Sequence, residues 1–187
     1  MILRTAQFSR CRTWRYSLSR TWQSKKPAAL FIGLNPSTAD EIQDDPTIRR
    51  CMRFAHAWGY GGLVMANLFA FRATDPENLT TVLDPIGPEN DRFLSTLSSE
   101  AGMVIAAWGA NGAFLGRAEH VLKLLRQAGV GAAPSREIYC LGVTKFELPR
   151  HPLYLPKTCT LVPYRSKCCP QGSTQNHSNI AWVWQLM

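Results

Sequence analysis

The 187-residue sequence lacks three features that would each place it in a particular class of protein. It has no uninterrupted apolar run near the about 20 residues of a membrane helix, so we expect no membrane association. Residues 1–20 are rich in arginine and contain no continuous apolar stretch, which argues against a secretory signal and favours a cytoplasmic location. None of the six cysteines forms a C-x-x-C pair, so we expect no zinc ribbon, no iron–sulfur centre and no other metal or cofactor.

Acidic residues are also scarce. The chain has 13 Asp and Glu against 21 Lys and Arg, which gives a formal net charge of +8 and a pI near 9.5. This excess favours anionic partners, and nucleic acid or a nucleotide is the partner that we expect. A basic surface on a domain that binds neither is the alternative. The composition gives no indication of the oligomeric state.

Strand and helix patterns alternate along most of the chain. Strand patterns cover residues 28–34, 63–69, 103–108 and 137–141, and helix patterns follow Asp45-Pro46 and cover residues 90–100 and 113–128. Asp45 can cap the first helix, with Pro46 at its first position. This order predicts a three-layer α/β/α fold with a mostly parallel, four-stranded central sheet. We expect a single α/β domain over residues 1–165, with a basic, aromatic N-terminal arm at 1–26, and a peripheral tail at 166–187.

The loops that follow these strands are the expected ligand site, because open α/β sheets bind ligands beyond the carboxyl ends of their strands. The first loop begins Gly33-Leu34-Asn35-Pro36-Ser37. Gly33 would let the backbone approach a ligand, Asn35 offers an acceptor and two donors, and Pro36 fixes the chain behind it. A turn residue bonded to its own backbone is the alternative for Asn35. Asn67 ends the second strand, where a buried amide needs partners.

A histidine and several arginines are further candidates. His151 lies in the loop after the last strand, between Arg150 and Pro152, where it could donate a proton or stabilise an anion. A surface histidine without a role is the alternative. On the first helix, a solvated charged face is the common explanation for neighbouring arginines, but phosphate contact is also consistent with them. The candidate phosphate or nucleic-acid contacts are Arg49, Arg50, Arg53 and Arg150.

Several motifs closely resemble the family catalogued as domain of unknown function 1643. They are Gly33-Leu34-Asn35-Pro36-Ser37-Thr38-Ala39-Asp40, Asp44-Asp45-Pro46-Thr47-Ile48-Arg49-Arg50-Cys51, Asn67-Leu68-Phe69, Arg72-Ala73-Thr74-Asp75-Pro76, Ala107-Trp108-Gly109 and His151-Pro152-Leu153-Tyr154-Leu155. The resemblance is specific and covers roughly residues 8–164. It implies a family but no reaction.

A more distant resemblance is to uracil-DNA glycosylases of the mismatch-specific type. These carry a Gly-x-Asn-Pro-Gly loop after the first strand and a His-Pro-Ser loop after the last. Between the two loops, one strand ends in asparagine and a later one ends near Trp-Gly or Leu-Gly. This sequence is similar in order, with Gly33–Ser37, Asn67, Trp108-Gly109 and His151-Pro152. The resemblance implies a uracil-DNA glycosylase-like fold and hydrolysis of the N-glycosidic bond of a base.

The same resemblance implies roles for single residues. Asn35 would hold the attacking water and His151 would stabilise the anionic base, so these two are the candidate catalytic residues. Asn67 would bind the base edge, and Phe69 or Trp108 would stack on a base that has left its own stack. The candidate substrate-binding residues are Gly33, Leu34, Pro36, Ser37, Asn67, Phe69, Trp108, Gly109 and Pro152.

The sequence also departs from the glycosylase pattern. Ser37 replaces a glycine, and Leu153 replaces the serine of His-Pro-Ser. An amide cannot accept a proton, so a stronger base would need a carboxylate from Asp40, Asp44 or Asp45, although Asp45 is better explained as a cap. Two alternatives therefore stay open. One is a non-catalytic module that binds a nucleotide or nucleic acid, and the other is a phosphate-handling enzyme in which the arginines of the first helix hold the anion.

Overall fold

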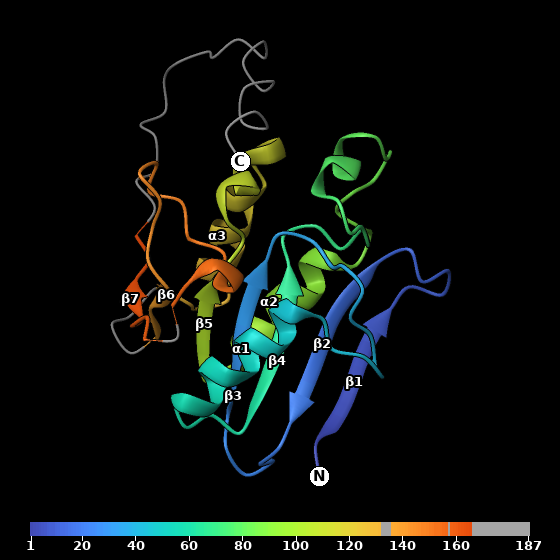
Figure 1. Cartoon of the computed structure of the whole chain (residues 1–187). Helices are drawn as coiled ribbons and strands as arrows, with labels where there is room; N and C mark the ends of the chain where they lie inside the picture. Colours follow the sequence, from blue (N-terminus) through green and yellow to red (C-terminus); the bar gives the residue numbers. More distant parts are fainter. Residues whose placement is uncertain (132–135, 157, 166–187) are drawn as a thin grey trace.

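The computed structural model describes residues 1–131, 136–156 and 158–165. Its main feature is a seven-stranded sheet with the order β1-β2-β4-β3-β5-β6-β7 (Figure 1). The central strands β4 (Gly62–Asn67), β3 (Ala28–Gly33), β5 (Met103–Ala106) and β6 (Ile138–Cys140) are parallel. The chain thus has the predicted α/β class, but its sheet has seven strands instead of four, because antiparallel strands extend it on both sides.

The N-terminal segment provides two of these additional strands. Strand β1 (Leu3–Phe8) pairs with β2 (Arg15–Thr21), and β2 pairs with β4, both antiparallel. On β2, Leu18 is fully buried and so are the charged side chains of Arg15 and Arg20. Residues 1–26 are therefore an integral edge of the sheet and not an arm. On the opposite edge, β7 (Val162–Pro163) pairs with β6.

Helices cover both faces of the sheet. Helix α1 (Pro46–Ala57) packs on the face that includes Phe31, while α2 (Asn90–Glu100) and α3 (Arg117–Gln127) pack on the face that includes Leu30 and Ile32. Alternate residues of β3 point to opposite faces, as the pleat of a strand requires, and both sets are apolar because both faces are covered. Short 3-10 helices η1 (Pro76–Thr80), η2 (Ala110–Gly116) and η4 (Pro152–Tyr154) lie in the connecting loops.

The observed helix starts agree with one local sequence signal and differ from another. The predicted start of α1 is confirmed, since the Asp45 carboxylate accepts a hydrogen bond from the Ile48 amide at 2.8 Å and Pro46 is the first residue of the helix. The helix predicted over 113–128 begins only at Arg117, because Leu115 and Gly116 have positive φ angles of 53° and 63°. No helix among the described residues is long and apolar enough to cross a membrane. The predicted tail, 166–187, lies outside the described residues.

Candidate functional site

A cavity of about 300 Å³ lies at the carboxyl ends of the parallel strands. Its lining comes from the ends of β3, β4 and β5, the start of α1 and the loop that contains His151. The predicted site residues that line it are Gly33, Leu34, Asn35, Ser37, Asn67, Trp108, Gly109, His151 and Pro152. Loops from several strands therefore meet at one cavity, as is typical of ligand sites in open α/β sheets.

Asn35 is held in this cavity by its amide nitrogen. Its Nδ2 donates to the carbonyl oxygen of Ala73 at 2.7 Å and to that of Pro36 at 3.2 Å. The bond to Pro36 is a local contact with the backbone, which was the alternative interpretation of Asn35. The bond to Ala73 fixes the side chain against a loop distant in sequence. Across the described residues, no donor reaches Oδ1 of Asn35. This oxygen is free to accept a hydrogen bond from a water or a ligand.

Asn67, at the end of β4, has the opposite arrangement. Its Oδ1 accepts a hydrogen bond from Nη2 of Arg15 at 3.3 Å, and both side chains are buried. Nδ2 of Asn67 has no acceptor within the described part of the chain. A Cβ on Gly33 would lie 2.8 Å from this Nδ2, so the glycine is needed to make room for the Asn67 amide.

Asp45 provides a carboxylate to the cavity lining. Its cap bond to Ile48 fixes the side chain at the start of α1. The other two acidic candidates are engaged elsewhere: Asp40 accepts from the amides of Ile42 and Gln43, and Asp44 pairs with two arginines. These amide bonds lower the pKa of Asp40 below its ordinary value. Of the three carboxylates, Asp45 alone lines the cavity.

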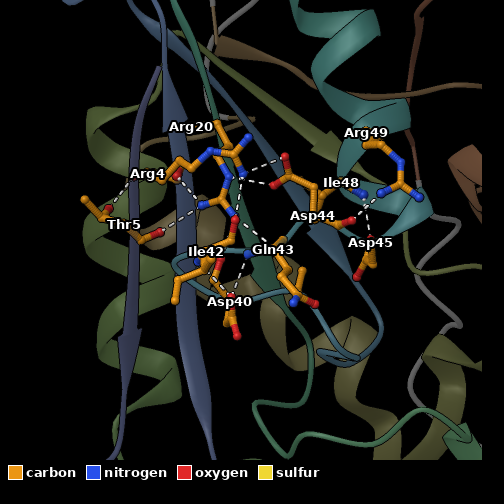
Figure 2. Close-up of polar contacts among 12 residues, drawn as sticks. Arg4, Thr5, Arg20, Asp40, Ile42, Gln43, Asp44, Asp45, Ile48 and Arg49 are labelled. Atoms are coloured by element: carbon orange, nitrogen blue, oxygen red, sulfur yellow. Dashed lines mark hydrogen bonds and ion pairs between the residues drawn. The ribbon is translucent and has the colours of Figure 1, made fainter. Parts of the chain in front are cut away.

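A buried arginine holds the loop that precedes Asp45 (Figure 2). Arg20, fully buried on β2, bonds Oδ1 of Asp44 through Nε at 2.7 Å. Its Nη2 donates to the backbone carbonyls of Asp40 and Gln43. Arg4 on β1 adds a bond to Oδ2 of Asp44 at 2.9 Å. The loop leading to Asp45 is thus attached to the antiparallel edge of the sheet.

His151 has a defined tautomer and a shifted pKa. Its Nδ1 accepts a hydrogen bond from the Leu153 amide at 3.3 Å and caps η4, so the proton of the neutral ring is on Nε2. Burial lowers the pKa of His151 below its ordinary value of 6.5, and the negative charge of Asp45 opposes this shift. At neutral pH, His151 is therefore an uncharged ring that can donate a hydrogen bond through Nε2.

Trp108 lines the cavity, but only 1% of its surface is exposed. Its indole packs so closely on Gly112 that a Cβ there would lie 2.1 Å from the Trp108 Cδ1 atom. On another side it meets the ring of Tyr164 edge-on, with 5.7 Å between centroids. Gly109, which follows it, has a φ of 74° that favours glycine and turns the chain into η2.

The remaining predicted site residues do not line the cavity: Pro36, Phe69, Arg49, Arg50, Arg53 and Arg150. Phe69 is fully buried in the core against Phe114 and not placed for stacking on a ligand. The guanidinium of Arg49 donates to the backbone carbonyl of Asp44, and that of Arg50 donates to the carbonyl of Leu155. These two arginines join α1 to its neighbouring loops. The cavity gives no support to a phosphate site built from them.

The lining also includes polar side chains that were not among the predicted site residues, and Arg15 and Asn111 are two of them. Arg15 lies on the antiparallel strand β2, where no strand-end rule would place a ligand contact. Asn111, in η2, has a buried Oδ1 without a hydrogen-bond partner in the described structure. The apolar residues Tyr16 and Leu18 alternate with polar ones next to Arg15, a pattern that favours a strand and could have placed Arg15 in the sheet. Nothing in the sequence alone identified Asn111.

Comparison with known proteins identifies the family. Residues 15–153 match the family model described as Protein of unknown function (DUF1643). The chain belongs to this family. The part of this DUF1643 chain that matches begins at the first residue of β2 and ends in η4, so it includes the strands and loops that line the cavity. No curated protein and no solved structure matches the chain.

Proposed function

We propose that this DUF1643 protein hydrolyses the N-glycosidic bond of a base in a nucleic acid or nucleotide, as uracil-DNA glycosylases do. The observation that supports the proposal is the presence of Asp45, Asn35 and His151 in the lining of one cavity. Asp45 is an acceptor for a proton, Asn35 presents a free Oδ1, and His151 presents an Nε2 proton. This reaction requires a group that holds the attacking water, a group that accepts its proton and a group that stabilises the leaving base.

The reaction then follows from these groups. Oδ1 of Asn35 accepts a hydrogen bond from a water, and the oxygen of that water bonds to C1′ of the sugar while the bond from C1′ to the base nitrogen breaks. The water proton passes to the Asp45 carboxylate. The base departs with the electron pair of the broken bond, and the hydrogen bond from Nε2 of His151 stabilises the resulting anion. The products are the free base and a sugar with a hydroxyl group on C1′.

The cavity volume is consistent with a single base. A base within a duplex would have to rotate out of the helix to enter the cavity. The net charge of +8 favours the approach of the anionic phosphate backbone to the protein. A mismatched or damaged base costs less to extrude. We therefore expect such bases, or bases in single strands, to be the better substrates.

The direct test is base release from oligonucleotides that contain uracil, a thymine mismatch, hypoxanthine or hydroxymethyluracil, measured by cleavage at the abasic site. Asn35→Ala and His151→Ala should each reduce release by at least about 100-fold, because each removes a group in contact with the reacting atoms. Arg53→Ala is the matched control, since Arg53 is exposed on α1 outside the cavity lining. Binding of the oligonucleotides without release of any base would contradict hydrolysis and favour a non-catalytic binding module.

A further inference from the structure

Arg15 differs from the other buried arginines in its lack of a carboxylate partner. Arg20 pairs with Asp44 and Arg117 with Asp91, whereas Arg15 makes no ion pair with any described residue. Its Nη1 donates to the carbonyl of Ala39 at 2.8 Å and its Nη2 to Asn67, but its buried Nε has no acceptor. An unpaired guanidinium is costly to bury, so a ligand that places partial negative charge beside it would stabilise it.

The charge of Arg15 persists despite its burial. Removal from water lowers its pKa to about 10, which leaves the guanidinium protonated at neutral pH. Arg15 lines the same cavity as Asp45 and His151. The cavity lining therefore includes a positive charge that forms no ion pair with a carboxylate of the described residues.

Arg15 also determines which group Asn67 presents. A side-chain amide has one acceptor oxygen and one donor nitrogen, and the Arg15 guanidinium can bond only to the oxygen. Nδ2 of Asn67 is left to face a ligand, and Gly33 provides the space for it. Both side chains of this pair thus offer donors and no acceptor.

We propose that Arg15 and Asn67 form an acceptor-selective subsite that binds the carbonyl edge of a keto base and rejects an amino edge. A carbonyl oxygen can accept from Nδ2 of Asn67 and gains from the positive charge of Arg15. An exocyclic amino group would meet these donors with another donor and leave them unsatisfied, which is the most effective basis for rejecting an analogue. The identification of the ligand as a base rests on the proposed function, but the selectivity does not depend on hydrolysis.

The test is equilibrium binding of free bases to the full-length protein, measured by titration calorimetry. The bases are compared two at a time, and the two members differ in a keto or an amino group. Hypoxanthine and adenine differ in a keto or amino group at C6, and uracil and cytosine differ in the same way at C4. Each keto base should bind at least about 10-fold more tightly than its amino counterpart. Arg15→Met should abolish this preference, and Arg72→Met, which removes an arginine outside the cavity lining that also has an unpartnered Nε, should retain it.

Folding of the variants is checked by thermal melting. Arg15→Met should melt within about 5 °C of the wild type, because an apolar side chain can replace an unpaired buried charge without a large loss. If it does not fold, Gly33→Ala provides the second variant, since its Cβ would displace Nδ2 of Asn67 and weaken the keto preference with Arg15 in place.

The outcomes separate this inference from the proposed function. Base release by an enzyme that binds keto and amino bases equally would overturn the subsite and leave hydrolysis standing. A keto preference that depends on Arg15, in a protein that releases no base, would support the subsite and contradict hydrolysis. Binding of inorganic phosphate that depends on Arg15, without binding of any base, would overturn the assignment to a carbonyl edge, and so would the absence of binding by every one of these probes.

Discussion

Asp45 has two roles that a single substitution can separate. As a helix cap it needs only an acceptor oxygen, which asparagine also has, whereas as a proton acceptor it needs the carboxylate. Asp45→Asn should therefore change the free energy of unfolding by less than about 0.5 kcal/mol and reduce base release by at least about 100-fold. Urea denaturation and the abasic-site assay measure the two effects.

Asp45→Ala is the comparison for that variant. It loses the cap as well, so its free energy of unfolding should fall by about 1 kcal/mol. Wild-type rates of base release by Asp45→Asn would show that another group accepts the proton.

The pH dependence of stability tests the environment of His151. Burial lowers the pKa of this side chain in the folded protein below 6.5. The unfolded chain therefore binds more protons than the folded protein as the pH falls below 6.5. The contribution of neutral His151 to stability is thus complete above pH 6.5 and is lost as the pH falls through the folded pKa. His151→Asn keeps a capping acceptor without a titrating ring and should flatten the decrease. Urea denaturation at several pH values provides the profile, and parallel profiles for the two proteins would contradict a shifted His151.

At the scale of the element, the loop from Asp40 to Asp45 depends on β2. Arg20 is fully buried and its donors bond to Asp44 and to backbone carbonyls of this loop (Figure 2). Without Arg20, Asp44 keeps only its bond to Arg4 and the loop carbonyls lose their buried donor, so Arg20→Met should cost about 3 kcal/mol of unfolding free energy. Arg92→Ala, which removes an exposed pair with Glu89, should cost less than about 1 kcal/mol. Equal losses in urea denaturation would contradict a structural role specific to Arg20.

The elements that sequence analysis predicted well are those specified by local chemistry. Asp45-Pro46 gave the start of α1 because a cap and a proline at the first helical position act within one turn. Strand β2 was missed because Arg15 and Arg20 are charged. Their burial depends on acceptors distant in sequence, among them those on the loop from Ala39 to Asp44, and no local sequence pattern contains these contacts.

Part of the candidate site was also predictable from the sequence, and the part that depends on distant contacts was not. Asn35, Asn67 and His151 follow parallel strands, whose carboxyl ends meet at one edge of a sheet, so the sequence order alone brought them together. Arg15 enters the cavity from an antiparallel strand and could not be placed by this rule. Phe69 follows the same strand as Asn67, but its side chain turns into the core. Which side of a loop faces the ligand depends on packing that the sequence pattern does not contain.

At the scale of the whole molecule, the two N-terminal strands should differ in importance. Most residues of β1 are exposed, whereas β2 contributes Leu18 to the core and Arg15 to the cavity. A chain that lacks residues 1–10 should melt cooperatively at a reduced temperature. A chain that lacks residues 1–26 should not melt cooperatively, since it exposes the edge of β4 and the core around it. Thermal melting followed by circular dichroism distinguishes the two chains. A cooperative transition in the chain that lacks residues 1–26 would contradict a sheet that depends on β2.

The proposed function and the subsite formed by Arg15 and Asn67 both place a base in this cavity, and a crystal structure with bound hypoxanthine would show whether a base lies there. We predict that the base lies in the cavity with O6 in hydrogen-bond distance of Nδ2 of Asn67 and beside the guanidinium of Arg15. Its N9, the nitrogen that would carry the sugar, should face Asp45 and Asn35. Hypoxanthine bound at another place would contradict the cavity as the base site, and hypoxanthine bound here with O6 directed away from Arg15 and Asn67 would contradict the subsite.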